Sequence, residues 1–460
     1  MPIGTKTQTH PSAFVIVESY LVATALVLVR YSTAANAILN PSSNRTQRRR
    51  MPFKMSPQQE PSPSTPSSYP VVSSLAENEE ELDHLENYNI PFSRIKTRLI
   101  LHLDINETIL LGDESGGDSR HDSVNKMLAK SAFCRLPTTS AAKTTTRAWD
   151  ETQQVEPTHW WDGQEIGKET SIPPLYTGWT WPHQCCPYYR TKYKSVSNTF
   201  IEHHGRIYQG LLDQCERKLA KSSFMEGSHI LPALYQTLHH LIINKDQQPC
   251  TVVFRTFGSD LQEVAEAVTQ FAKGKHPAFA HIHHPEFHLG PDCLFQGRWK
   301  ETLEYDGRVS KIYQLWNSEE TNLIASGDQE ILQLLDQIPI CGIRDDYPYW
   351  AGHDWDPTAG KPVWVPYYRP GQQVYDHHIL FDDNIHNLPN DGIACVREQQ
   401  ADGSFVVVDG ATMHERYQGY NVVRTPTIEP ILNPNWFLEQ VEKCRRRLIH
   451  RLLTKEDTAE

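Results

Sequence analysis

Acidic and hydroxyl side chains stand at the ends of three short apolar runs. The runs and the polar residues that follow them are 98–103 before Asp104, 251–255 before Thr256, and 378–381 before Asp382 and Asp383. Carboxylate oxygens are the ligands that Mg²⁺ prefers, and a hydroxyl beside a helix N-terminus can hold phosphate oxygens. If the three run ends meet in space, they would bind a magnesium ion beside a phosphoryl group, with Asp104 as a carboxylate nucleophile.

The elements that would bring these side chains together are strands of a parallel sheet. Short apolar runs bounded by charge predict buried strands. After Thr256, apolar residues recur at helical spacing over 261–271, with Ser259 as the expected N-cap and Asp260 suited to the positive end of the helix. A strand that leads into a helix is the unit of a parallel α/β sheet, which binds ligands at the carboxyl ends of its strands. Further helices are predicted over 207–220, 229–243 and 436–453.

The order of these motifs resembles that of the haloacid dehalogenase (HAD)-like superfamily. In that superfamily the first motif is a strand ending in Asp-x-Asp-x-Thr, the second a strand-end Ser or Thr, the third a Lys, and the fourth a strand followed by acidic residues. The matching residues here are Asp104-Ile-Asn106-Glu-Thr108, Thr256, and Asp382-Asp383, within residues 98–388, about three fifths of the chain. The resemblance implies an α/β fold: a Rossmann-like parallel sheet core with a cap domain inserted between the first and second motifs.

The resemblance also implies a role for each matching residue. Asp104 would be the nucleophile of magnesium-dependent phosphate-ester chemistry, and it would form an aspartyl-phosphate. The residues implied in catalysis are Asp104, Asn106, Thr256 and Lys361. Phosphate binding is implied for Thr256, Gly258 and Lys361. Mg²⁺ binding is implied for Asp104, Asp382, Asp383 and the main-chain carbonyl of Asn106. The expected substrate is a phosphorylated small molecule.

Position 106 departs from the family pattern. Asn106 stands where phosphatases of the superfamily carry the Asp that protonates the leaving group and then activates water. An amide cannot exchange a proton at neutral pH, so this acid/base role is lost. Two functions therefore stay open. One is a HAD-like hydrolase with a different or weakened acid/base step, and the other is a catalytically degenerate binding or regulatory module.

The lysine of the third motif has two candidates. Lys361 in Ala-Gly-Lys-Pro precedes Asp382 by 21 residues, which resembles the usual spacing, and Lys311 in Val-Ser-Lys-Ile-Tyr is the alternative. Asp345 and Asp346 form a second acidic pair after an apolar run. We expect Asp382 and Asp383 to be the fourth motif because Lys361 precedes them.

The segment between the first two strands is too long for a simple crossover. It holds about 145 residues, and its stretch 149–193 is rich in Trp, Tyr and Pro. These aromatic residues are expected to form the core of an irregular domain rather than to contact substrate. The predicted organisation is 1–55 as an apolar targeting segment, 56–84 as a disordered Pro/Ser-rich linker, 85–112 and 225–435 as the α/β core, 113–224 as a cap-like insertion, and 436–460 as a basic C-terminal helix.

The N-terminal segment allows several interpretations. Residues 13–29 are apolar except for Glu18. The length of this stretch is at the lower limit for a membrane span. The segment would be a secretory signal, a weak membrane anchor or an organelle transit sequence, or translation would begin only at Met51 or Met55. The folded body is expected in a reducing compartment, with the cytoplasm favoured and with membrane anchoring or organelle targeting through the N-terminal segment as alternatives.

Charge and cysteine content exclude two classes of protein. The chain has a net charge of −12, and the residues after position 58 hold 37 basic and 55 acidic side chains, a net charge of −18. Such an acidic body is unsuited to nucleic acid, whereas a bound metal ion can still attract a phosphorylated small molecule into one pocket. Nine cysteines without a CxxC motif indicate reduced thiols rather than a disulfide framework or a zinc ribbon. The sequence does not indicate an oligomeric state.

Two groups of histidines have mainly structural interpretations. The dense run at 281, 283, 284 and 288 is expected to be an exposed loop rather than a transition-metal site, because no Cys or acid completes a familiar spacing. His377 and His378 adjoin the strand of the fourth motif. Strand alternation allows only one of them to face the site, and a structural role is favoured for both.

Overall fold

The computed structural model describes only part of the chain. The described residues are 96–111, 119–135, 156–173, 175, 185–188, 197–222, 224, 229–303, 309–369, 371–385 and 392–457. All described residues belong to one compact unit within His84–Glu460. The predictions for 1–55 and 56–84 therefore lie outside the described residues. Within the described part, no helix is both long and apolar enough to cross a membrane.

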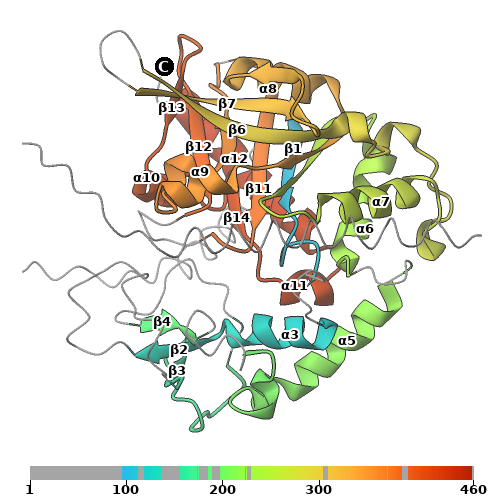
Figure 1. The fold of residues 1–460 in the computed structure, drawn as a ribbon, viewed down its shortest axis with the longest axis vertical. Helices are drawn as coiled ribbons and strands as arrows, with labels where there is room; N and C mark the ends of the chain where they lie inside the picture. Colours follow the sequence, from blue (N-terminus) through green and yellow to red (C-terminus); the bar gives the residue numbers. More distant parts are fainter. Residues whose placement is uncertain are drawn as a thin grey trace, which may run out of the picture. The chain divides into compact units, whose positions relative to one another are not determined.

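An eight-stranded, mostly parallel sheet forms the centre of the described unit (Figure 1). Its strands, in spatial order, are β14 (Val422–Arg424), β11 (Val374–Asp382), β1 (Lys96–Asp104), β5 (Cys250–Thr256), β9 (Ile340–Arg344), β6 (Leu294–Leu303), β7 (Val309–Asn317) and β8 (Leu323–Ser326). Neighbouring strands are parallel from β14 to β6, and β7 is antiparallel to both of its neighbours, β6 and β8. The prediction of an α/β fold with a parallel sheet is confirmed.

Apolar side chains alternate between the two faces of β1 and so build a core on each side of the sheet. Leu101 and Leu103 belong to a cluster formed with α6 (Pro232–Asn244) and α7 (Leu261–Ala272). Ile100 points to the other face, where its cluster includes residues of β7 and α8 (Asp328–Gln337). This arrangement buries β1 on both faces, as its nearly continuous apolar sequence predicts.

Four predicted helices are confirmed. They are α5 (Gln209–Ser222), α6, α7 and α12 (Trp436–Asp457). The rings of Trp436 and Phe437 lie 5.7 and 5.2 Å from that of Phe381, which anchors α12 against β11. The predicted cap at Ser259 is wrong: Asp260 is the N-cap residue of α7, and it makes no side-chain capping bond. Its carboxylate instead accepts a hydrogen bond from Asn106, which lies across the sheet edge.

The register of the central strands places the three predicted run ends side by side. Asp104 is opposite Arg255, the residue before Thr256, and Leu103 is opposite Phe381, the residue before Asp382. Because β11, β1 and β5 are parallel neighbours, their carboxyl ends share one edge of the sheet.

A second, three-stranded sheet carries Lys361 beside this edge. It consists of β10 (Lys361–Val365), β12 (Ala394–Gln399) and β13 (Phe405–Val407), and β10 packs against β11. The turn into β10 requires glycine, because a Cβ on Gly360 would lie 2.1 Å from the carbonyl oxygen of Ile393. That same carbonyl accepts the backbone N–H of Lys361 at 2.6 Å, so the close approach fixes the start of the strand.

The described residues between β1 and α6 share a hydrophobic cluster with the segment that follows β14. They form α3 (Arg120–Ala129), α5 and a small antiparallel sheet of β2 (Ala132–Arg135), β3 (His159–Trp160) and β4 (Cys185–Pro187). Trp160 and Tyr188 are buried in this cluster together with Ile428 and Ile431 of α11 (Ile428–Leu432), which follows β14. The interpretation of these two aromatic residues as core is confirmed, whereas Trp149, Trp179, Trp181 and Tyr189 lie outside the described residues.

Candidate functional site

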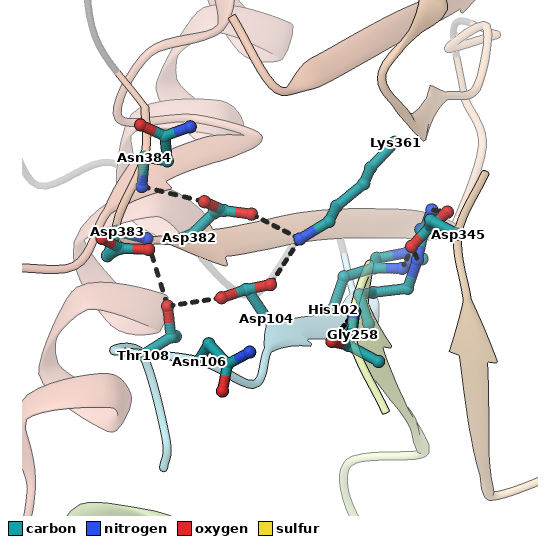
Figure 2. Close-up of polar contacts among 12 residues, drawn as sticks. His102, Asp104, Asn106, Thr108, Gly258, Asp345, Lys361, Asp382, Asp383 and Asn384 are labelled. Atoms are coloured by element: carbon teal, nitrogen blue, oxygen red, sulfur yellow. Dashed lines mark hydrogen bonds and ion pairs between the residues drawn. The ribbon is translucent and has the colours of Figure 1, made fainter. Parts of the chain in front are cut away.

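Three carboxylates meet at the carboxyl ends of β1 and β11 (Figure 2). Asp104, Asp382 and Asp383 each offer one oxygen atom, and these atoms all lie within 4.8 Å of one another. Asp104 is 6% exposed and Asp382 is fully buried, so their charges are largely removed from water. In the part of the chain that the structure describes, no other group of three His, Cys, Asp or Glu side chains is close enough to hold a metal ion together.

The ammonium group of Lys361 bridges two of these carboxylates. Its Nζ donates to Asp104 Oδ1 and, at 2.8 Å, to Asp382 Oδ2, while the ring of Phe257 lies 5.0 Å away. Burial alone would lower the pKa of Lys361, but Asp104 and Asp382 hold it above its usual value. Lys311, the alternative in the sequence, lies on β7 with its Nζ 5.7 Å from the ring of Tyr349. The structure therefore brings Lys361, and not Lys311, to the carboxylates.

Burial and the charges of neighbouring residues shift the pKa values of the three carboxylates. Burial and the neighbouring charge of Asp382 raise the pKa of Asp104 well above its usual value, although Lys361 opposes this shift. Burial also raises the pKa of Asp382, again against Lys361. Burial acts to raise the pKa of Asp383, but Lys130, the hydrogen bond with Glu107 and the charge of Arg424 together hold it below its usual value.

Hydrogen bonds from the two strand-end loops hold the carboxylates in place. Thr108 Oγ1 donates to Asp104 Oδ2 at 3.2 Å and accepts the backbone N–H of Asp383 at 3.1 Å. The backbone N–H of Asn384 donates to Asp382 Oδ1 at 2.9 Å. Thr108 thus connects the loop after β1 to the loop after β11, which explains why a hydroxyl is suited to this position of the first motif (Figure 2).

Two of the predicted phosphate-binding residues, Thr256 and Gly258, lie together at the carboxyl end of β5 and next to Asn106. The backbone N–H of Gly258 donates to Thr256 Oγ1 at 2.8 Å, and a Cβ at this position would lie 3.4 Å from both Thr256 Oγ1 and Asn106 Nδ2. The same Cβ would lie 2.6 Å from Asp260 Oδ2, so a side chain at this position would have to displace the carboxylate of Asp260. Asn106 Nδ2 donates to Asp260 Oδ2 at 2.8 Å, whereas Asn106 Oδ1 is buried without a hydrogen-bond partner.

Sequence reasoning missed two charged residues of the site. Lys130, directly after α3, donates from Nζ to Asp383 Oδ2 at 2.6 Å and also to Glu107. Lys130 is 8% exposed, and a cavity of about 20 Å³ lies between it and Arg424. Glu107 is inside the first motif, and its positive φ of 59° turns the chain there. Nothing in the spacing of the sequence connects Lys130 to Asp383, 253 residues later.

The formal charges of this group suit a divalent cation. Four carboxylates, those of Asp104, Glu107, Asp382 and Asp383, face only two ammonium groups, those of Lys130 and Lys361. Two negative charges are therefore uncompensated among these six side chains. Hard oxygen donors with excess negative charge are the ligand set that Mg²⁺ prefers, and an ion at Asp104, Asp382 and Asp383 would relieve the repulsion between them.

Replacing Lys130 with Gln should strengthen the binding of divalent cations. The change removes an ammonium group that competes for Asp383, so we expect Mg²⁺ or Mn²⁺ to bind at least about tenfold more tightly. Isothermal titration would measure this affinity. Lys126→Gln, on the same helix α3, is the matched control and should bind as the parent does. Equal affinities for all three proteins would contradict the prediction.

A buried ion pair lies behind the site. Arg255, on β5 and fully buried, donates from Nε to Asp345 Oδ2 at 2.9 Å and from Nη2 to Asp345 Oδ1 at 2.5 Å. Its Nη1 donates at 3.0 Å to the carbonyl of Pro362, the residue after Lys361. Asp345 also accepts from Tyr313, and the neighbouring Asp346 accepts the backbone N–H of Tyr349. This second acidic pair is therefore structural, and it connects β5, β9 and β10.

The histidines before the fourth motif bond to the protein interior. His378 Nδ1 lies 3.0 Å from Nε2 of His102, and His377 Nε2 lies 2.7 Å from the carbonyl oxygen of Tyr420. Burial lowers the pKa of His377 to about 4 and that of His378 to about 3. Both residues are therefore neutral at physiological pH and serve as packed, hydrogen-bonded groups of the core.

Comparisons of the chain with known protein families, with curated proteins and with solved structures found no match. The candidate site is therefore defined by its own geometry: three carboxylates, a bridging ammonium group, and a hydroxyl beside an open backbone turn.

Proposed function

We propose that this chain is a HAD-like hydrolase that uses Mg²⁺ to transfer a phosphoryl group from a small phosphate ester to Asp104. The observation that carries this proposal is the position of Lys361 Nζ between Asp104 and Asp382, with Asp383 beside them. A carboxylate nucleophile must approach a negatively charged phosphate, so it needs positive charge close by. This arrangement supplies one fixed cation and ligands for a second.

Several residues of the chain would take part in the first step, the transfer of the phosphoryl group to Asp104. A carboxylate oxygen of Asp104 forms a bond to phosphorus while the bond to the ester oxygen breaks, and the leaving alkoxide takes a proton from water. Lys361 neutralises charge on Asp104 and on the phosphoryl oxygens, and Thr256 with the N–H groups after it would bind those oxygens. Bound Mg²⁺, held by Asp104, Asp382, Asp383 and the main-chain carbonyl of Asn106, would supply further charge neutralisation.

The second step lacks its usual catalyst. Water must attack phosphorus to release inorganic phosphate and regenerate Asp104, and a base at position 106 would normally take the proton. The Asn106 amide cannot do so, and its Nδ2 is already engaged with Asp260. We therefore propose that the aspartyl-phosphate forms and breaks down slowly.

The insertion between β1 and β5 is proposed to act as a cap. Its described residues before α6 share a hydrophobic cluster with α11, and Lys130, directly after α3, extends to Asp383. A domain that contacts the metal-binding acids can shield the reaction from bulk water.

The second candidate function is a catalytically degenerate binding or regulatory module. The observation that favours it is Asn106. Asn106→Asp should raise the hydrolysis of p-nitrophenyl phosphate by about 10²- to 10⁴-fold, the usual size of an acid/base contribution. Asp260 lies 2.8 Å from the side chain of Asn106, so the carboxyl group introduced by Asn106→Asp would lie next to that of Asp260. Two carboxyl groups so close share a proton, which could be donated to the leaving group.

A continuous phosphate-release assay would measure this gain, with Asn384→Asp as the control that adds the same charge nearby. A parent protein that already hydrolyses the ester rapidly would rule out the degenerate module. If Asn106→Asp did not increase the rate of hydrolysis, Asn106 would not be the cause of the slow breakdown of the aspartyl-phosphate.

The proposed hydrolase is tested by thermal melting with Mg²⁺ and beryllium fluoride, which mimics an aspartyl-phosphate. At a hundred times its dissociation constant, a ligand that binds only the folded state adds about 2.7 kcal/mol of stability. We expect a clear rise in Tm for the parent and none for Asp104→Asn. An equal response in both proteins, or no response in the parent, would refute the proposal.

A further inference from the structure

A pair of histidines outside the proposed site brings two imidazole nitrogens together. His239 is on α6, and His281 is in the segment between α7 and β6. Their Nε2 atoms lie 3.1 Å apart, and the two rings are nearly perpendicular, at 87°. His281 is exposed and His239 is partly exposed, so the pair lies at the surface of the described part of the chain.

We propose that His239 and His281 form a two-imidazole site for a transition-metal ion, with Zn²⁺, Ni²⁺ or Cu²⁺ as the suitable class. Imidazole suits these ions, whereas Mg²⁺ prefers oxygen donors, so this site is chemically distinct from the one at Asp104.

The separation of the two nitrogens agrees with chelation. With metal–nitrogen bonds of about 2.0 to 2.1 Å, two imidazoles at octahedral to tetrahedral angles hold their nitrogens about 2.9 to 3.4 Å apart. The observed distance lies within this range. The same distance suits an N–H···N hydrogen bond, so metal binding requires the proton of the donor imidazole to move from Nε2 to Nδ1 and both rings to turn until their lone pairs point at the ion.

Packing already holds the pair in position. The ring of His239 lies 4.9 Å from that of Phe279, which in turn lies 5.4 Å from Phe271 in the core. Backbone bonds from Ile282 to Phe279 and from His284 to Ala272 fix the chain on either side of His281. A preorganised pair loses little conformational entropy when it binds an ion.

The neighbouring histidines do not complete a larger site in the described residues. His284 Nδ1 is 3.1 Å from Glu286, and His283 Nε2 lies next to Gly274, 3.2 Å from where its Cβ would be. With two protein ligands, water would fill the remaining coordination positions. His281 and His283 are exposed, as predicted for the run 281–288. The partner of His281, His239, lies 42 residues earlier in the chain.

A metal ion in this position would connect α6 to the segment before β6. Because the ion binds only when both ligands are in place, it would stabilise the folded chain by mass action. This inference does not depend on the proposed phosphoryl chemistry.

Titration of the full chain, without a histidine tag and after removal of metals by EDTA, tests the site with NiCl₂ and CoCl₂. With excess Mg²⁺ present to occupy the carboxylates at Asp104, isothermal titration should show one equivalent of Ni²⁺, and Co²⁺ should give visible absorption from imidazole coordination. His239→Gln and His281→Gln should each weaken Ni²⁺ binding by at least about tenfold, which corresponds to 1.4 kcal/mol.

The matched control is His283→Gln, which removes an exposed histidine of the same loop and should bind Ni²⁺ as the parent does. Melting curves without metal would establish that each variant is folded. No binding by the parent, or equal binding by the parent and both pair variants, would overturn the proposal. A loss in the His283→Gln control equal to that in the pair variants would do the same, since diffuse binding to the loop would then explain the signal.

Discussion

Asp104→Asn is expected to reduce the turnover of phosphate esters by at least about a thousandfold. The amide cannot attack phosphorus, and Asp382 and Asp383 are not expected to take its place, because both are proposed to hold Mg²⁺ and Asp383 also pairs with Lys130. The measurement is the rate of release of p-nitrophenol from p-nitrophenyl phosphate in the presence of Mg²⁺. Turnover equal to that of the parent would exclude Asp104 as the nucleophile.

The same substitution should leave the fold at least as stable as that of the parent. Burial and Asp382 raise the pKa of Asp104, which means that the folded protein disfavours its charged form. An amide of the same shape removes this penalty and can still accept a hydrogen bond from Lys361. Urea denaturation would measure the change in the free energy of unfolding. A large loss of stability would mean that lost turnover reports unfolding rather than chemistry.

Asp345→Asn is expected to cost about 3 to 5 kcal/mol of unfolding free energy, because it leaves the buried guanidinium of Arg255 without its counter-charge. Arg255 is fully buried, and Asp345 is 3% exposed, so water cannot replace the lost carboxylate. The loss would also loosen the contact between Arg255 and Pro362, next to Lys361. The expected result is a lower urea midpoint with an unchanged denaturant slope.

The control for this prediction is Asp376→Asn. Asp376 pairs with Arg98 at 3.0 Å, but its side chain is 41% exposed, so the change should cost less than about 1 kcal/mol. The double variant Arg255→Met with Asp345→Leu should recover much of the lost stability, because it removes both buried charges together. If Asp345→Asn lowered the free energy of unfolding no more than Asp376→Asn does, the buried pair of Arg255 and Asp345 would not be a major contribution to stability.

The sequence was sufficient to predict the strands and the carboxylates of the site. The runs before Asp104, Thr256 and Asp382 are short, apolar and bounded by polar residues, and these local patterns are typical of buried parallel strands. Because parallel neighbours end at one edge, the side chains after them had to meet there. Lys361 was found by its spacing from Asp382, which comes from the family resemblance and not from any local pattern.

The features that sequence reasoning missed depend on contacts between distant residues. Lys130 meets Asp383 only because the insertion folds back to the sheet edge, and Arg255 is paired with Asp345 across two strands. A charged residue inside an apolar run, such as Arg255, signals a buried ion pair, but it does not say which acid is the partner. The N-cap of α7 was misplaced at Ser259 because Asn106 engages Asp260, a contact that local capping preferences do not include.

The most direct test of the proposed chemistry is the mass of the protein after incubation with Mg²⁺ and acetyl phosphate, a small phosphoryl donor. We expect the intact mass to increase by one phosphoryl group, which peptide analysis would locate on Asp104, and the adduct should persist because Asn106 cannot activate water. Asn106→Asp should shorten its lifetime, and Asp104→Asn should carry no adduct. An unmodified parent protein, or a phosphoryl group that remains in Asp104→Asn, would contradict an aspartyl-phosphate at this site.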